Sequence, residues 1–325
     1  MKQALLSICI PIYNRANYLE LMLARFMEDV DLFNEKIDLF ISDNCSEEDL
    51  HAIVQDYAAR GLNIRYYRNE VNTGGDANIC ACFRAGQGDY TWVLGSDDIP
   101  VSGVLRDVVS LLETYSPGIL HLNHYDKRKQ EIVVYSDPND FFVDMHVWIT
   151  FITANILRTV FIEGYDFEHY VSTSLAQVPL FLKAAFGSDR NVNLNRRYLE
   201  DYHDSITGGG YNVFEVYAVN LLSMFQTMVQ EGQLSEKAYR RIKRSIYREF
   251  LAENILNLLV LRRESRNKKD SGWKIIREWY GFKPYVLTDF IHVTCKFGSR
   301  RVVKDTKKFI TKVCNTLRPD VAEDS

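Results

Sequence analysis

The fold is decided by Trp92-Val93-Leu94-Gly95-Ser96-Asp97-Asp98, where an apolar run that starts at Tyr90 ends in two small residues and two adjacent carboxylates. A buried strand that delivers acids to its C-terminal end is typical of an α/β protein that binds a ligand beyond that end. Adjacent carboxylates are costly unless a cation neutralises them, because each disfavours ionisation of the other. The pair therefore indicates a divalent-cation site. The alternative is an exposed loop with two solvated acids before Pro100.

Outward from this stretch, strand and helix patterns alternate over roughly the first third of the chain. Short connections between them favour a doubly wound, mostly parallel sheet, with ligands bound at the carboxyl ends of its strands. We predict strands at Leu5–Ile10, Ile37–Ile41, Ile64–Arg68, Tyr90–Leu94 and Gly118–Asn123, and helices over Arg15–Met27, Ser46–Arg60, Ala77–Ala85 and Leu105–Tyr115. Residues 130–210 are mixed and turn-rich, and a helical pattern begins at Tyr211.

Composition places the chain among soluble globular proteins. Of its 325 residues, 46% are apolar and 25% are charged, and no run approaches the 18 apolar residues of a membrane-spanning helix. No N-terminal signal pattern is expected, and the six cysteines lack the spacing of a disulfide framework. We therefore expect a cytoplasmic protein with reduced thiols.

The net charge of −4 conceals a strong asymmetry. Residues 237–318 contain 22 Lys and Arg against 7 Asp and Glu, whereas residues 1–236 contain 17 against 33. Such a division favours two functional surfaces. Nucleic-acid binding is disfavoured because most of the chain is strongly acidic.

Three further segments lie where strands of the predicted sheet end. Pro11-Ile12-Tyr13-Asn14-Arg15 follows the first strand, and the ring of Tyr13 could stack on a flat ligand or simply cap the core. Asp43 ends the second strand, where it could accept hydrogen bonds from a base or merely cap a helix. Asn72-Thr73-Gly74-Gly75-Asp76-Ala77-Asn78 is a glycine turn before a helix, which lets the backbone approach an anion.

The four segments, in this order and spacing, resemble those of family 2 glycosyltransferases of the GT-A fold, and the resemblance covers residues 5 to about 125. Three of them, Ile41–Ser46, Asn72–Asn78 and Trp92–Asp98, are most similar to the abequosyltransferase type of O-antigen sugar transferase. So is Tyr170–Ser174, which leads into an apolar helix.

The resemblance implies a division of the chain into two parts. Residues 1–210 would be a GT-A catalytic domain, with a nucleotide-sugar half at about 1–125 and an acceptor half at about 126–210. Residues 211–325 would be a basic helical C-terminal region.

The resemblance also implies roles for individual residues. Asp98 would ligate the Mg²⁺ or Mn²⁺ that carries the donor pyrophosphate, and Asp97 would reach the ribose or a metal-bound water. Asp43 would bind the base. The whole set implied for the nucleotide is Pro11, Tyr13, Arg15, Asp43, Asn72, Gly74, Gly75, Asn78, Ser96 and Asp97.

Two positions depart from the family pattern. Ser96 replaces the first acid of the metal motif, so only two carboxylates remain there. Gln177 lies where inverting members of the family carry a general base, and an amide cannot take a proton from a sugar hydroxyl. Either Asp166 or Glu168 serves as the catalytic base, or the sugar keeps its anomeric configuration and the leaving phosphate is the base; the abequosyltransferase likeness favours retention.

Two later features have alternative interpretations. His203, before Gly208-Gly209-Gly210, would contact the metal or the pyrophosphate, or else be a surface histidine. Phe290–Val313 interleaves Lys and Arg with apolar residues, a pattern able to lie on an anionic membrane, although a solvated helix face would look similar.

These features predict a metal-dependent glycosyltransferase on the cytoplasmic face of the inner membrane. Its donor would be a UDP-, CDP- or similar nucleotide sugar, and its acceptor a surface glycan, polyprenyl-linked, such as an O-antigen or capsule unit. The alternatives are a sugar-nucleotide pyrophosphorylase and a non-catalytic sugar-nucleotide-binding protein. The first would need a glycine-rich basic loop after the first strand, and Pro11–Arg15 does not supply one.

Overall fold

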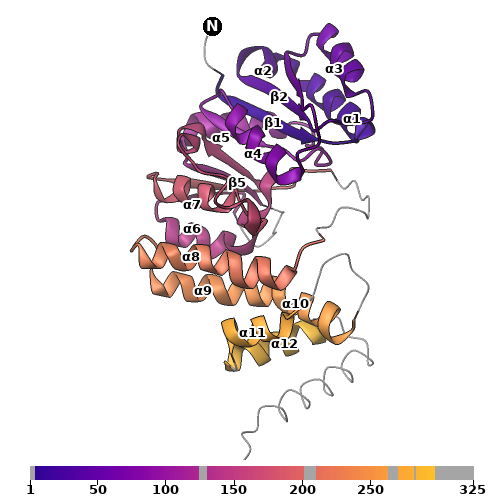
Figure 1. Cartoon of the computed structure of the whole chain (residues 1–325). Helices are drawn as coiled ribbons and strands as arrows, with labels where there is room; N and C mark the ends of the chain where they lie inside the picture. Colours follow the sequence, from indigo (N-terminus) through magenta and orange to yellow (C-terminus); the bar gives the residue numbers. More distant parts are fainter. Residues whose placement is uncertain (1–3, 124–129, 201–209, 263–269, 282, 297–325) are drawn as a thin grey trace, which may run out of the picture. The chain divides into compact units, whose positions relative to one another are not determined.

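A computed structural model describes residues 4–123, 130–200, 210–262, 270–281 and 283–296 (Figure 1). The chain divides into two compact units, residues 1–205 and residues 206–325. Each unit is built differently: the first contains a sheet, and the described part of the second is helical.

One eight-stranded sheet organises the first unit, in the order β3-β2-β1-β4-β7-β5-β8-β6. β7 runs antiparallel to both of its neighbours and β6 runs antiparallel to β8, whereas the other pairs are parallel. Strands β1 to β5 and β8 therefore all end at the same side of the sheet, called here the carboxyl edge. The predicted α/β class with a mostly parallel sheet is confirmed. The strands are β1 (Leu6–Ile12), β2 (Ile37–Asp43), β3 (Ile64–Arg68), β4 (Tyr90–Val93), β5 (Ile119–Asn123), β6 (Ile132–Tyr135), β7 (Asn155–Arg158) and β8 (Asn191–Asn195).

Helices connect the strands of this unit, and Figure 1 shows them packed around the sheet. They are α1 (Ala16–Phe26), α2 (Val30–Glu35), α3 (Leu50–Ala59), α4 (Gly75–Ala85), α5 (Val104–Tyr115), α6 (Pro138–Met145) and α7 (Val178–Phe186). Short 3-10 turns lie between them at η1 (Met27–Asp29), η2 (His146–Thr150), η3 (Ile152–Ala154), η4 (Thr159–Ile162) and η5 (Val171–Thr173).

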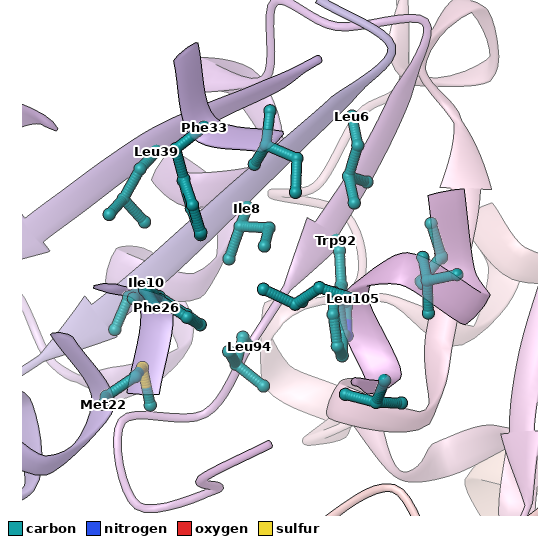
Figure 2. Close-up of a cluster of buried hydrophobic side chains, with 14 of the residues drawn as sticks. Leu6, Ile8, Ile10, Met22, Phe26, Phe33, Leu39, Trp92, Leu94 and Leu105 are labelled. Carbon is teal, nitrogen blue, oxygen red and sulfur yellow. The ribbon is translucent and has the colours of Figure 1, made fainter. Parts of the chain in front are cut away.

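The alternation of side chains along β1 explains why both faces of the sheet are covered. Leu6, Ile8 and Ile10 point to one face, where they join the buried cluster that Figure 2 shows with side chains of α1 and α5. Helix α4 contacts β1, β2 and β4, and its Cys82 and Phe83 are buried outside that cluster. Burying each such aliphatic side chain stabilises the fold by about 2 kcal/mol, which fixes the strands whose ends carry the polar loops.

The largest differences from the predicted helices are a later start of α3 and an additional helix, α2. The helix predicted to open at Ser46 begins instead at Leu50, because the carboxylate of Asp49 accepts the backbone N–H of Ala52 (3.1 Å) and caps it. Ser46 is left to accept a hydrogen bond from the backbone N–H of Asn14 (3.0 Å). Helix α2, which the sequence patterns did not predict, follows α1 after a single 3-10 turn.

The described part of the second unit consists of helices. They are α8 (Leu221–Gln230), α9 (Glu236–Ile246), α10 (Ala252–Asn254), α11 (Gly272–Tyr280) and α12 (Pro284–Lys296), with π-helical turns η6 (Glu215–Asn220), η7 (Tyr247–Leu251) and η8 (Ile255–Val260). Arg244 of α9 forms an ion pair with the buried Asp289 of α12 (3.2 Å). Within the described ranges, no helix combines the length and the apolar character needed to cross a bilayer.

Candidate functional site

The loop after β4 places its acids at the carboxyl edge. The backbone N–H of Leu94 donates to the carbonyl of Cys9 in β1 (3.0 Å), which extends the pairing of the two strands by one residue. The chain then turns, and the N–H of Asp98 donates to the carbonyl of Gly95 (3.0 Å). Asp97 and Asp98 are both half-buried, and Ser96 is buried.

Asp98 accepts a hydrogen bond from Thr153, a residue outside the predicted motifs. Its Oδ2 accepts a hydrogen bond from the hydroxyl of Thr153 (2.5 Å), which itself accepts the N–H of Gly95 (2.9 Å). Burial, the largest cause, and the charge of Asp97 raise the pKa of Asp98 to about 6, although the hydrogen bond from Thr153 and the charge of Arg15 oppose the shift. A bound cation would favour the ionised form that burial disfavours.

Asp97 is paired with a cation from a different loop. Its Oδ2 lies 2.6 Å from Nη1 of Arg15, and both side chains are 30% exposed. Arg15 immediately precedes α1, and its guanidinium also lies over the ring of Tyr18, 5.8 Å from the centroid. The pair therefore joins the loop after β1 to the loop after β4 at the predicted diphosphate position.

Asp43 ends β2 as a fully buried carboxylate. Its Oδ1 accepts the N–H of Ser46 (2.8 Å), and its Oδ2 accepts the hydroxyl of Tyr66 (2.6 Å) and Nη1 of Arg68 (2.9 Å). Burial favours a higher pKa, but the hydrogen bonds from Ser46 and Tyr66 and the charge of Arg68 outweigh it and lower the pKa of Asp43. A base could contact Asp43 only at an oxygen that already accepts a hydrogen bond.

Asn44, the next residue, ties β2 to the glycine turn. Its Nδ2 donates to Oδ1 of Asn72 (2.9 Å) and to the carbonyl of Gly74 (3.2 Å). Its Oδ1 accepts Nδ2 of Asn69 (2.9 Å) and both the N–H and the hydroxyl of Thr73 (2.9 and 3.0 Å). The side chain of Asn72 is thus engaged in shaping its own turn.

The glycine turn then opens α4. Gly74 has φ +86°, a backbone conformation that a side chain would strain, and Gly75 is the first residue of the helix. Asn78, one of the residues implied for the nucleotide, is buried, and its Oδ1 accepts the hydroxyl of Ser42 (2.6 Å) while its Nδ2 donates to the carbonyl of Ser42 (3.0 Å). It anchors α4 to β2, so the helix N-terminus is held at the carboxyl edge.

The residues predicted around the base lie at the end of β1. Pro11 is half-buried within the strand, and Tyr13 is 41% exposed just beyond it. Asn14 has φ +48° and accepts the N–H of Glu47 (2.7 Å), which ties this loop to the loop after β2.

The two predicted catalytic residues of the acceptor half, Gln177 and Asp166, both form hydrogen bonds with main-chain groups. Gln177 precedes α7, and its Nε2 donates to the carbonyl of Thr150 (3.0 Å), three residues before Thr153. Asp166 is exposed and accepts the N–H groups of Glu168 (3.1 Å) and His169 (3.4 Å). His203 lies outside the described residues.

Several residues of the site escaped the sequence patterns. Thr153 lies in a short turn before β7, and no local sequence pattern predicts its role. Arg68 and Tyr66 lie in β3, and the end of that strand at the carboxyl edge is a signal that could have drawn attention to Arg68.

The donor set fits a hard divalent cation completed by phosphate and water oxygens. Asp97 and Asp98 supply carboxylate oxygens, the ligand type that Mg²⁺ takes beside substrate phosphates. Among the described residues, no three His, Cys, Asp or Glu side chains gather as a cage of protein ligands.

Comparisons with known proteins agree with the predicted family and fold class. The profile described as "Glycosyl transferase family 2" matches residues 7–170. "Abequosyltransferase RfbV" of Salmonella typhimurium is 38% identical over 112 residues, which is 34% of this chain and only 32% of that relative's length.

Among solved structures, S. aureus TarS 1-349 in complex with UDP superposes with a TM-score of 0.59 at 17% identity, covering 88% of this chain and 80% of TarS 1-349. The mannosyltransferase PcManGT from Pyrobaculum calidifontis, in complex with GDP-Man and Mn²⁺, gives 0.52 at 13% identity, covering 97% and 81%. These likenesses confirm the predicted fold class.

Proposed function

Because this chain belongs to glycosyl transferase family 2, we propose that it transfers a hexosyl or deoxyhexosyl group from a nucleoside-diphosphate sugar to a glycan acceptor. One observation carries the proposal: Asp98, Asp97 and Arg15 meet at the carboxyl edge, inside the matched region. The acids come from the loop after β4 and the guanidinium from the loop after β1.

The residues suit a diphosphate leaving group. Asp98, assisted by Asp97, would hold Mg²⁺ or Mn²⁺, which would neutralise the charge that develops on the departing diphosphate. Arg15 is positioned to exchange Asp97 for a phosphate oxygen, and guanidinium–phosphate contacts are strong. The first N–H groups of α4 lack helical partners and favour an anion.

The nucleotide would lie over the ends of β1 and β2. Tyr13 offers an exposed ring for the base, and Arg68, 45% exposed while paired with Asp43, offers hydrogen-bond donors at the end of β3. Carbonyl oxygens of uracil and cytosine would accept these donors. We therefore propose UDP or CDP as the carrier, and the UDP in the TarS complex supports this choice.

The acceptor is proposed to be a lipid-linked surface glycan, such as an O-antigen or capsule unit, because a relative that is 38% identical over 112 residues is named an abequosyltransferase. Asp166 is occupied with backbone N–H groups and Glu168 with Arg84 (2.9 Å). These contacts favour transfer with retention, in which no side-chain base is needed. Proton NMR of the product linkage distinguishes retention from inversion.

The second unit is proposed to hold the enzyme on an anionic membrane at the cytoplasmic face of the inner membrane. Trp273, Leu287 and Ile291 are between 40% and 44% exposed on α11 and α12. Leu287 and Ile291 are one helical turn apart, and exposed Lys283 and Lys296 flank them. The basic pattern predicted over Phe290–Val313 lies outside the described residues beyond Lys296.

A screen of nucleotide sugars with Mn²⁺, in which mass spectrometry detects released nucleoside diphosphate, tests the proposal. We expect one donor to be consumed by the full chain, faster with a polyprenyl-linked glycan present, and not by Asp98→Ala. Turnover by Asp98→Ala at the parent rate would refute the assignment of the site.

A further inference from the structure

The contacts of Thr153 go beyond those of a core residue. It lies in the 3-10 turn η3 and is fully buried. Its hydroxyl accepts the N–H of Gly95 (2.9 Å) and donates to Oδ2 of Asp98 (2.5 Å). Its own carbonyl accepts Nε1 of the buried Trp92 (2.7 Å). One residue therefore contacts the strand, the turn and the acid of the predicted metal loop.

The space around the Asp98 carboxylate is also restricted, which supports the same interpretation. A Cβ on Gly95 would lie 2.5 Å from Oδ2 of Asp98 and 3.2 Å from the hydroxyl oxygen of Thr153. The carboxylate is therefore packed closely between the turn and Thr153, with Oδ2 committed to the hydroxyl. Within the described ranges Oδ1 accepts no hydrogen bond, so it is the oxygen left for a cation.

We propose that Thr153 is a positioning residue that fixes the Asp98 carboxylate in the orientation that binds the divalent cation. The inference rests on the proposed function, because it concerns the same site. A residue that orients a metal ligand changes metal affinity without touching the metal, typically by about 10–100-fold when it is replaced.

The hydroxyl makes this role separable from packing. Thr153→Val keeps the shape and removes both hydrogen bonds, whereas Thr153→Ser keeps the hydroxyl and removes only a methyl group. Thr153→Ala removes the hydroxyl without inserting an apolar methyl beside the carboxylate. If Thr153 is a positioning residue, the Thr153→Val and Thr153→Ala variants should behave alike. The Thr153→Ser variant should then resemble the parent protein.

Titration of the full chain with Mn²⁺, followed by electron paramagnetic resonance of the free ion in the presence of UDP or CDP, measures this directly. We expect Mn²⁺ to bind about 10-fold more weakly to Thr153→Val and Thr153→Ala, and to bind Thr153→Ser nearly as tightly as the parent. Nucleotide binding in EDTA should be unchanged in all three variants. Thermal unfolding of each variant confirms that it is folded.

The outcomes separate this inference from the proposed function. Parent-like Mn²⁺ affinity in Thr153→Val, together with loss in Asp98→Asn, would overturn the role of Thr153 and leave the metal site intact. Parent-like affinity in Asp98→Asn would overturn the metal site itself. If Thr153→Ser, Thr153→Val and Thr153→Ala all lost the same Mn²⁺ affinity, the effect would come from packing, which would also contradict the inference.

Discussion

Asp98 shows how one residue can be arranged for ligand binding at the expense of stability. It is a half-buried acid with an acidic neighbour, and burial raises its pKa from 3.8 to about 6. Its counter-charge, Arg15, is bonded to Asp97 rather than to Asp98. At neutral pH the residue is therefore an ionised group in surroundings that disfavour ionisation, which is the condition under which a cation binds favourably.

The first prediction concerns the effect of this charge on stability. Because the folded pKa of Asp98 is raised, its contribution to stability is full below pH 3.8 and is lost as pH rises through about 6. Asp98→Asn should therefore be about 2–3 kcal/mol more stable than the parent at pH 8 without metal, and about equal to it at pH 4. Urea unfolding at both pH values measures the difference. A parent protein that equals the variant at pH 8 would contradict the buried charge.

The second prediction concerns Gly95. In Gly95→Ala the new Cβ would displace the Asp98 carboxylate, because it would lie 2.5 Å from Oδ2. We expect about 1–3 kcal/mol of destabilisation from overpacking and about 10-fold weaker Mn²⁺ binding. Calorimetric titration measures the affinity, and nucleotide binding in EDTA serves as the control. Undiminished Mn²⁺ affinity would mean that the orientation of Asp98 is unimportant.

At the scale of elements, the carboxyl edge is built by side chains that cross-link loops. Asn44 contacts the turn before α4 through Asn72, Gly74, Asn69 and Thr73. Asn78 fixes α4 to β2 in the same way. These amides hold the loops together, since each supplies both donors and acceptors.

The third prediction tests that construction. Asn44→Ala should destabilise the protein by about 2–4 kcal/mol, because it removes several part-buried hydrogen bonds at once, and it should weaken nucleotide binding. Asn139→Ala, which removes an amide that donates to the carboxylate of Asp137 two residues away (2.9 Å), is the matched control. Chemical denaturation and nucleotide titration provide the two readouts. Equal effects in both variants would show that Asn44 has no special role.

Much of this arrangement was predictable from the sequence, for a definable reason. β4 and the acids after it were predictable because an apolar run that stops abruptly in charge is a local signal. The turn at Gly74, which has φ +86°, was likewise predictable, because the pair Gly74-Gly75 indicates a turn. Thr153 was not predictable, because it reaches Asp98 across 55 residues of sequence and depends on the pairing of β7 with β4. The engagement of Asp43 by Arg68 likewise depends on the register of β2 with β3.

At the scale of the whole molecule, the acidic and basic halves of the sequence serve different proposed partners. The first unit contains the proposed donor site, at the carboxyl edge of its sheet. The second supplies exposed cations and apolar side chains suited to an anionic bilayer, where electrostatic attraction and apolar insertion add.

The fourth prediction is that the full chain binds vesicles containing phosphatidylglycerol but not vesicles of phosphatidylcholine alone, and that salt reverses the binding. Leu287→Asp combined with Ile291→Asp should reduce binding severalfold, since both remove exposed apolar surface from α12. Val160→Asp, at a residue 56% exposed in the first unit, is the control and should bind normally. Co-sedimentation gives the measurement, and equal binding by both variants would exclude α12 as the contact.

The most direct test of the central claim is calorimetric titration of UDP and CDP into the parent and into Asp98→Ala, each with Mn²⁺ and with EDTA. We predict that one nucleotide binds the parent tightly with Mn²⁺, and that Asp98→Ala with Mn²⁺ binds no better than the parent does in EDTA. Equal Mn²⁺-dependent affinity in the two proteins would contradict a donor site built on the acids that follow β4.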